Sequence, residues 1–85
     1  MNIELRFFAS VREALGVSQE SASLPDSVTT VGGVRDFLVA RGGIWAEALA
    51  PQKVLRMAYN QNMSDPGTAL TAGCEVAFFP PVTGG

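Results

Sequence analysis

Hydrophobic and polar residues alternate over the first eight positions of the chain. Ile3, Leu5 and Phe7 fall on one side of such an extended segment, and the residues between them fall on the other. This period of two predicts a strand over residues 2–8 with one buried face. Phe8 takes a position on the otherwise polar face, so we expect an aromatic ring on the exposed side of this strand.

The spacing becomes helical in two later segments. Ser10, followed three residues later by Glu13, matches a capping box and predicts a short helix that Gly16 closes. The main helix is predicted from apolar residues spaced three and four positions apart, and its N-cap is expected at Thr29 or Thr30. The apolar stripe of this helix consists of Val31, Val34, Phe37 and Leu38.

Further segments complete the predicted order of elements. A weakly alternating polar stretch at residues 18–24 predicts an edge strand, and an apolar stretch before Pro51 predicts one more short helix. The remaining strands are expected at residues 53–60, from Met63 onward and at residues 75–79. This order is typical of an α+β domain of the β-grasp, or ubiquitin-like, type, with a mixed sheet of about five strands on one main helix. The first and last strands can pair in parallel because a helical crossover separates them.

Composition and charge narrow the class of protein. The 85 residues, 47% of them hydrophobic and 16% charged, argue for one compact domain. The net charge is −2 and the basic residues are scattered, which argues against a nucleic-acid partner. No apolar run approaches the ~18 residues that a membrane span needs, and no basic and apolar leader is present. We therefore expect a cytoplasmic protein without a membrane partner.

Side-chain chemistry is sparse in this sequence. The chain has no histidine, which removes the usual general base and the commonest metal ligand, and we expect no metal and no bound cofactor. Cys74 is the only cysteine, so an internal disulfide is excluded and a reducing compartment is favoured. Although Cys74 could carry a persulfide, no neighbouring residue in the sequence would activate its thiol. We expect Cys74 to take no part in the chemistry.

The segment after the last predicted strand is the most distinctive. We divide the chain into a folded body at residues 1–79 and an extended tail at residues 80–85. Two prolines end the strand and favour an extended conformation, and the two final glycines can enter a channel too narrow for any side chain. Fully extended, the tail would reach roughly 20 Å. Its residues are Pro80, Pro81, Val82, Thr83, Gly84 and Gly85.

The carboxylate of Gly85 is the expected reactive group. A carboxylate is a poor electrophile, but an ATP-dependent partner can convert it to an acyl adenylate. A sulfur donor that displaces AMP then leaves a thiocarboxylate. A carrier of this kind needs no acid, base or metal of its own, which agrees with the sparse side-chain chemistry.

Three segments resemble the small subunits of molybdopterin synthase, a family of ubiquitin-like sulfur carriers. They are residues 7–13, the pair Asn60 and Gln61, and residues 75–85, which end in Phe-Phe-Pro-Pro-Val-Thr-Gly-Gly. The resemblance implies that an E1-like adenylyltransferase uses ATP to activate Gly85. It implies that a donor such as a cysteine desulfurase or a rhodanese-like protein supplies the sulfur.

The same resemblance implies a large partner subunit. The tail would insert into this subunit and donate sulfur to cyclic pyranopterin monophosphate. The catalytic side chains would belong to the large subunit, and two small subunits would sit at the ends of its dimer, forming a heterotetramer. The small subunit alone would then be a sulfur donor rather than a complete enzyme.

Exposed aromatic residues predict where this partner docks. Phe8 and Phe79 fall on the outward faces of strands that we expect to be neighbours, and the resemblance adds Met63 to the same surface. An alternative is that these three residues cover the edge of the sheet or form a second small core. Without a partner, they could also drive weak self-association.

Other functions share parts of this pattern. A sulfur carrier for thiamine or tRNA thiolation has the same Gly-Gly end, but the Phe-Phe-Pro-Pro segment argues against it. A ubiquitin-like modifier would join Gly85 to lysines of target proteins. An interaction module with an inert tail would lose no function on removal of Gly85.

Overall fold

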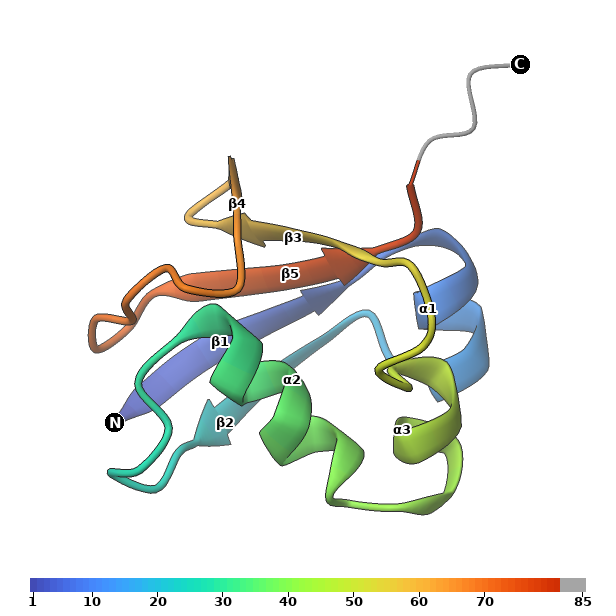
Figure 1. Ribbon diagram of the computed structural model, residues 1–85, viewed down its shortest axis with the longest axis horizontal. Helices are drawn as coiled ribbons and strands as arrows, with labels where there is room; N and C mark the ends of the chain where they lie inside the picture. The colour runs from blue at the N-terminus through green and yellow to red at the C-terminus, as the bar shows by residue number, and fades with distance from the viewer. Residues whose placement is uncertain (82–85) are drawn as a thin grey trace.

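The computed structural model describes residues 1–81 and contains a five-stranded mixed sheet with helices on one face (Figure 1). The strands lie in the order β2-β1-β5-β3-β4, with β1 and β5 parallel and the other neighbours antiparallel. This arrangement confirms the β-grasp prediction. The elements are β1 (Asn2–Phe7), α1 (Ala9–Leu15), β2 (Gln19–Ser23), α2 (Val31–Val39), α3 (Gly43–Ala48), β3 (Arg56–Tyr59), β4 (Asn62–Ser64) and β5 (Glu75–Phe79).

The core lies between the sheet and α2. Every second residue of β1 is fully buried, as the alternation predicts, and Val76 and Phe78 of β5 are buried beside them. Phe7 is central to this core. Its ring stacks on Phe78 at 6.5 Å between centroids and meets the edge of Trp45 at 5.7 Å. The buried residues that α2 contributes are Val31, Val34 and Leu38.

The predicted cap of the main helix is confirmed at Thr30. Its Oγ1 accepts a hydrogen bond of 3.0 Å from the backbone N–H of Gly33. Gly32 has a packing reason to be glycine, because a Cβ at this position would lie 2.9 Å from Cβ of Pro66. The backbone N–H of Gly32 donates to the carbonyl of Pro66 at 2.8 Å. The N-terminal turn of α2 is thus held close to the loop after β4.

The predicted capping box at Ser10 is wrong. Helix α1 begins at Ala9, and its N-cap is Phe8, whose side chain makes no capping bond. The reason is that the chain enters the helix directly from the sheet. The N–H of Phe8 still donates to the carbonyl of Phe78 in β5, while its own carbonyl already accepts from Arg12. Ala9 makes the abrupt change of direction with a φ of +52°.

The third strand is shorter than predicted and begins at Arg56 rather than at residue 53. The guanidinium group of Arg35 explains the difference. Its Nε donates to the carbonyl of Leu49 at 2.9 Å, and its Nη2 donates to those of Ala50 and Lys53. Carbonyls turned towards Arg35 cannot also join the strand ladder. The segment before β3 is therefore a loop fastened to α2.

The edges of the sheet differ from each other. Polar β2 forms one edge, as predicted, and is fastened to the helical layer by the ion pair between Glu20 and Arg41. The guanidinium carbon of Arg41 also lies 4.4 Å from the centroid of the Trp45 ring. Short β4 forms the other edge. No helix within residues 1–81 is long and apolar enough to cross a membrane.

Candidate functional site

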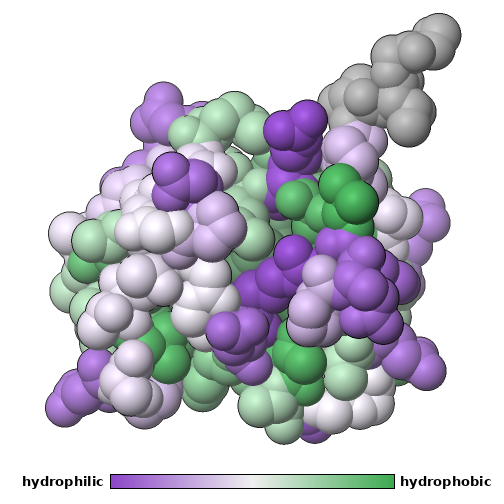
Figure 2. Space-filling model, viewed as in Figure 1, coloured by the Kyte–Doolittle hydropathy of each residue, from purple (hydrophilic) through white to green (hydrophobic). Residues whose placement is uncertain are grey.

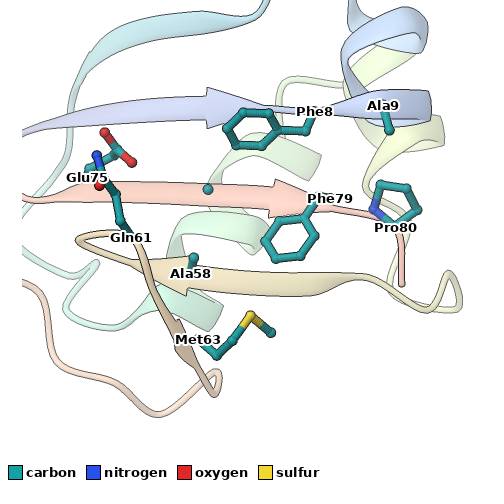
Figure 3. Close-up of a pocket in the computed structure, with 9 residues that line it drawn as sticks. Phe8, Ala9, Ala58, Gln61, Met63, Glu75, Phe79 and Pro80 are labelled. Atoms are coloured by element: carbon teal, nitrogen blue, oxygen red, sulfur yellow. The ribbon is translucent and has the colours of Figure 1, made fainter. Parts of the chain in front are cut away.

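The face of the sheet opposite α2 carries a compact apolar surface, here called the outer patch. The strand register explains how it forms from residues far apart in sequence, since Ala77 lies opposite Ala58, which lies opposite Met63. Two residues further along β5, Phe79 lies beside Phe8 at the end of β1 (Figure 3). The outer patch consists of Phe8, Ala58, Met63, Ala77 and Phe79.

The two aromatic rings of the outer patch are in contact. The centroids of Phe8 and Phe79 are 6.3 Å apart, and the planes meet at 81°, an edge-to-face arrangement. The side chains of Phe8 and Met63 nevertheless remain 43% and 63% exposed. Such exposure of large apolar side chains that lie together is unusual for a surface that meets only water.

Two alanines shape this surface into a hollow of about 410 Å³. Ala58 and Ala77 are buried beneath the larger side chains, although strand alternation directs their Cβ atoms to the outward face. Small residues at the centre and large ones around them leave room for a side chain of a partner. Figure 3 shows Met63 approaching from β4 on the side away from Phe8, with Gln61 and Glu75 towards the far end of the strands.

The helix-bearing face is different in character. Figure 2 shows hydrophobic residues there in separate small groups among hydrophilic ones. Val54, which is exposed outside the outer patch, borders a second hollow whose lining includes the charged residues Lys53, Arg56 and Asp65. Single exposed apolar side chains need no special explanation. The outer patch is therefore the main candidate for a docking surface within the described residues.

Charged groups border the outer patch. The guanidinium carbon of Arg6 lies 5.7 Å from the centroid of the Phe8 ring. Arg56 lies directly opposite Phe79 in the register of β3 and β5 and is exposed. The sequence did not single out either arginine as a site residue. Strand alternation puts both arginines on outward faces, Arg6 with Phe8 and Arg56 with Ala58, but only the strand register shows that Arg56 lies beside Phe79.

The tail begins at the edge of this same surface. Strand β5 ends at Phe79, as predicted, and Pro80 lines the hollow next to Phe79. A partner that covers the outer patch would therefore meet the start of the tail. The predicted roles of Val82, Thr83, Gly84 and Gly85 lie outside the described residues.

The structure also locates Cys74 and the three residues predicted to dock the partner. Cys74 is 3% exposed and belongs to the hydrophobic core, so its thiol faces neither solvent nor the outer patch. Residues 1–81 contain no group of three or more His, Cys, Asp or Glu side chains placed to hold a metal ion. The structure brings the three predicted docking residues, Phe8, Met63 and Phe79, onto one surface.

Comparisons with known proteins agree on one family. The family model described as the ThiS family matches residues 5–85. Two bacterial proteins named molybdopterin synthase sulfur carrier subunit, from Haemophilus influenzae and Escherichia coli, are each 42% identical over 83 residues. The match covers 98% of this chain and 99% of each relative.

Solved structures give a consistent result. SAMP1 from Haloferax volcanii superposes with a TM-score of 0.77 at 29% identity, and the match covers all of both chains. A chain from the complex of subunits 1 and 2 of the molybdopterin-converting factor of Helicobacter pylori superposes with a TM-score of 0.66 at 25% identity, again over all of both chains.

Proposed function

Because this chain belongs to the ThiS family, we propose that it is the sulfur carrier subunit of a molybdopterin synthase and acts in molybdenum cofactor biosynthesis. The observation that carries the proposal is the 42% identity, over nearly the whole chain, to two relatives with that name. The ending Phe-Phe-Pro-Pro-Val-Thr-Gly-Gly supports it independently, because prolines favour an extended conformation and glycines have no side chain to obstruct a narrow channel.

The reactive atom in this proposal is the carboxylate carbon of Gly85. An E1-like adenylyltransferase joins the carboxylate to the α-phosphate of ATP and releases pyrophosphate. A sulfur nucleophile from a cysteine desulfurase or a rhodanese-like protein then displaces AMP. Where that nucleophile is a persulfide, a thiol reduces the resulting S–S bond and frees the thiocarboxylate. ATP is consumed on the activating enzyme, and this chain holds no cofactor.

The thiocarboxylate then works inside the large subunit. We propose that residues 80–85 enter that subunit and that the sulfur attacks a carbon of cyclic pyranopterin monophosphate, forming a carbon–sulfur bond as a carbon–oxygen bond of the substrate breaks and its oxygen leaves. Water cleaves the acyl–sulfur bond and restores the carboxylate of Gly85. General acids and bases for these steps come from the large subunit, in keeping with a carrier that contains no histidine.

The outer patch fits the docking step. Phe8, Met63 and Phe79 present apolar area around a hollow, and Pro80 lies on its rim. Docking through this surface fixes the start of the tail against the partner, so the tail needs only to extend to reach the reaction centre. The structural relative in a complex of two molybdopterin-converting factor subunits supports a large-subunit partner, and we propose the heterotetrameric assembly.

Intact mass spectrometry tests the proposed function. The full chain is incubated with the E1-like enzyme, ATP and a sulfur source, beside a variant that lacks Gly85. The expected result is a gain equal to the mass difference between sulfur and oxygen, on the full chain only. A full chain that keeps its mass with an activator that modifies another carrier would overturn the carrier mechanism.

A second candidate function is conjugation to other proteins. The relative from Haloferax volcanii is a small archaeal modifier protein by name, and it matches the whole chain at 29% identity. A modifier would form an amide bond between Gly85 and a target lysine, releasing AMP from the adenylate. Conjugates that survive reducing agents and disappear when Gly85 is removed would favour this function over sulfur transfer alone.

A further inference from the structure

Charged residues on the outward face of the sheet are sorted by position. Arg6 and Arg56 flank the aromatic pair at the end of the sheet where Pro80 leaves β5. Glu4 and Glu75 lie on the same face, two residues back along β1 and beyond Ala77 on β5, away from the tail. The face therefore has a basic end next to the tail and an acidic end further from it.

Arg6 is not neutralised within the fold. Residues 1–81 contain an ion pair between Arg41 and Glu20, and Arg6 takes part in none. Its Nε is buried without a hydrogen-bond partner, and its guanidinium group rests on the exposed ring of Phe8. A buried donor without an acceptor costs about 1–3 kcal/mol, so hydrogen bonding within the described residues does not explain the position of this Nε.

The acidic end shows the opposite imbalance. Glu4 and Glu75 lie directly opposite each other on the parallel strands β1 and β5. Like charges in this relation destabilise a sheet. Ser21 relieves Glu4, because its hydroxyl lies 2.8 Å from each carboxylate oxygen. Neither carboxylate pairs with Arg6, although the three side chains share one face.

A single partner surface could compensate both the arginines at the basic end and the glutamates at the acidic end. A partner that brings carboxylates to the basic end and a cation to the acidic end would satisfy all four side chains at once. An arginine fork already lying on an aromatic ring is well placed for such a contact, because little side-chain freedom remains to be lost. Charge complementarity around an apolar centre is a common means of choosing one partner and its orientation.

We propose that Arg6 and Arg56, with Glu4 and Glu75 opposing them, determine which large subunit docks on the outer patch and in which orientation. The partner surface carries carboxylates beside the entrance that accepts the tail and at least one cation on the far side of the outer patch. This inference rests on the proposed function, since it names the chemistry of the partner in that same docking step.

A charge swap tests this inference without changing the net charge. The variant Arg6→Glu/Glu75→Arg abolishes the sorting, because each end of the face then carries one acidic and one basic side chain. Its affinity for the large subunit of the same organism is measured calorimetrically at about 0.01 M and about 0.15 M ionic strength. We expect Kd to rise about tenfold or more at the lower ionic strength, with a smaller rise at the higher one. The matched control is Glu20→Arg/Arg41→Glu, which reverses the ion pair between β2 and the helical layer, outside the outer patch, and should leave Kd unchanged.

Additional variants keep the test decisive if the swap disturbs folding. Arg56 is exposed, so Arg56→Gln should fold normally and still weaken binding, whereas Arg56→Lys should bind more tightly than Arg56→Gln. A swap and an Arg56→Gln variant that both bind as tightly as the wild type would overturn the inference while leaving the carrier function intact. A wild-type chain that gains sulfur on Gly85 yet binds no large subunit would reject the docking step and the inference together.

Discussion

The side chain of Asn60 completes the ladder of β5 by bonding to the backbone of Glu75. The N–H of Asn60 donates to the carbonyl of Glu75 at 2.8 Å, and the N–H of Glu75 donates to Oδ1 of Asn60 at 2.9 Å. Asn60 and Gln61 have φ values of +47° and +68° and form the two-residue turn between β3 and β4. One asparagine thus fixes both the turn beside Met63 and the start of β5.

Substitutions of Asn60 separate these two roles. Asn60→Gly keeps the backbone conformation and loses the Oδ1 acceptor, so we expect a loss of about 1 kcal/mol in the free energy of unfolding. Asn60→Ala keeps a Cβ at positive φ but loses the local hydrogen bonding that lets asparagine tolerate it, so this variant should lose about 1 kcal/mol more than Asn60→Gly. Urea denaturation measures both values. Equal stability of the two variants would mean that the left-handed conformation is unimportant here.

Ala9 joins β1 to α1 with a φ of +52°, a conformation that costs a residue with a Cβ roughly 1–2 kcal/mol. Ala9→Gly should therefore raise the free energy of unfolding by about 0.5–1 kcal/mol, after the extra chain entropy of glycine is subtracted. Because Phe8 is oriented by this turn, the same variant should bind the large subunit no more tightly than the wild type. Thermal and urea unfolding supply the measurement.

Ala14 in the same helix is the matched control for this prediction. It is exposed and has an ordinary helical backbone, so Ala14→Gly should lower the free energy of unfolding by about 0.5–1 kcal/mol. The two alanine-to-glycine changes are thus expected to have opposite signs. If both variants are destabilised, the positive φ of Ala9 stores no strain.

Sequence patterns predicted the elements better than the connections between them. Alternation in β1 was sufficient to place Phe8 on the outward face, since a period of two needs only local information. The start of α1 was missed because an alanine at position 9 gives no sequence signal that its φ is positive. The late start of β3 was missed because it depends on Arg35, a residue far away in sequence. Long-range side-chain bonds of this kind leave no periodic trace.

The features of the candidate site likewise fall into those that the sequence could predict and those that it could not. Phe8, Met63 and Phe79 could be named from strand alternation and from the family resemblance, and the structure places them together. The hollow above Ala58 and Ala77 and the separation of charges along the sheet could not be predicted. Both depend on which residues of β1, β3 and β5 lie opposite one another. Register is a property of the whole sheet, and no single segment of this sequence determines it.

Arg35 fastens the loop before β3 to α2, and its burial lowers the pKa of its guanidinium group, with Asp36 opposing the shift. Arg35→Met removes the hydrogen bonds to the carbonyls of Leu49, Ala50 and Lys53. We expect it to lower the free energy of unfolding by about 1–3 kcal/mol.

Lys53→Met is the control for Arg35→Met, because Lys53 takes part in this contact through its backbone carbonyl and its side chain is exposed. The free energy of unfolding should change by less than about 0.5 kcal/mol in this variant. Hydrogen exchange should also quicken in the loop before β3 of Arg35→Met and remain unchanged in Lys53→Met. Equal free energies of unfolding of Arg35→Met and Lys53→Met would show that the loop is held by its apolar contacts instead.

The edge-to-face contact between Phe8 and Phe79 predicts that the two rings are coupled in binding, because both lie on the docking surface and contact each other. Phe79→Ala should raise Kd for the large subunit by about tenfold or more, as expected for an aromatic residue near the centre of an interface. Phe8→Ala should act in the same direction, and a double-mutant cycle should give a coupling of about 0.5–1.5 kcal/mol between the rings. Ile44→Ala, which shortens a side chain on α3 that is 50% exposed and lies outside the outer patch, should leave Kd unchanged. Additive effects of the two phenylalanine changes would mean that the partner separates the rings on binding, and an unchanged Kd in both would remove the outer patch as the docking surface.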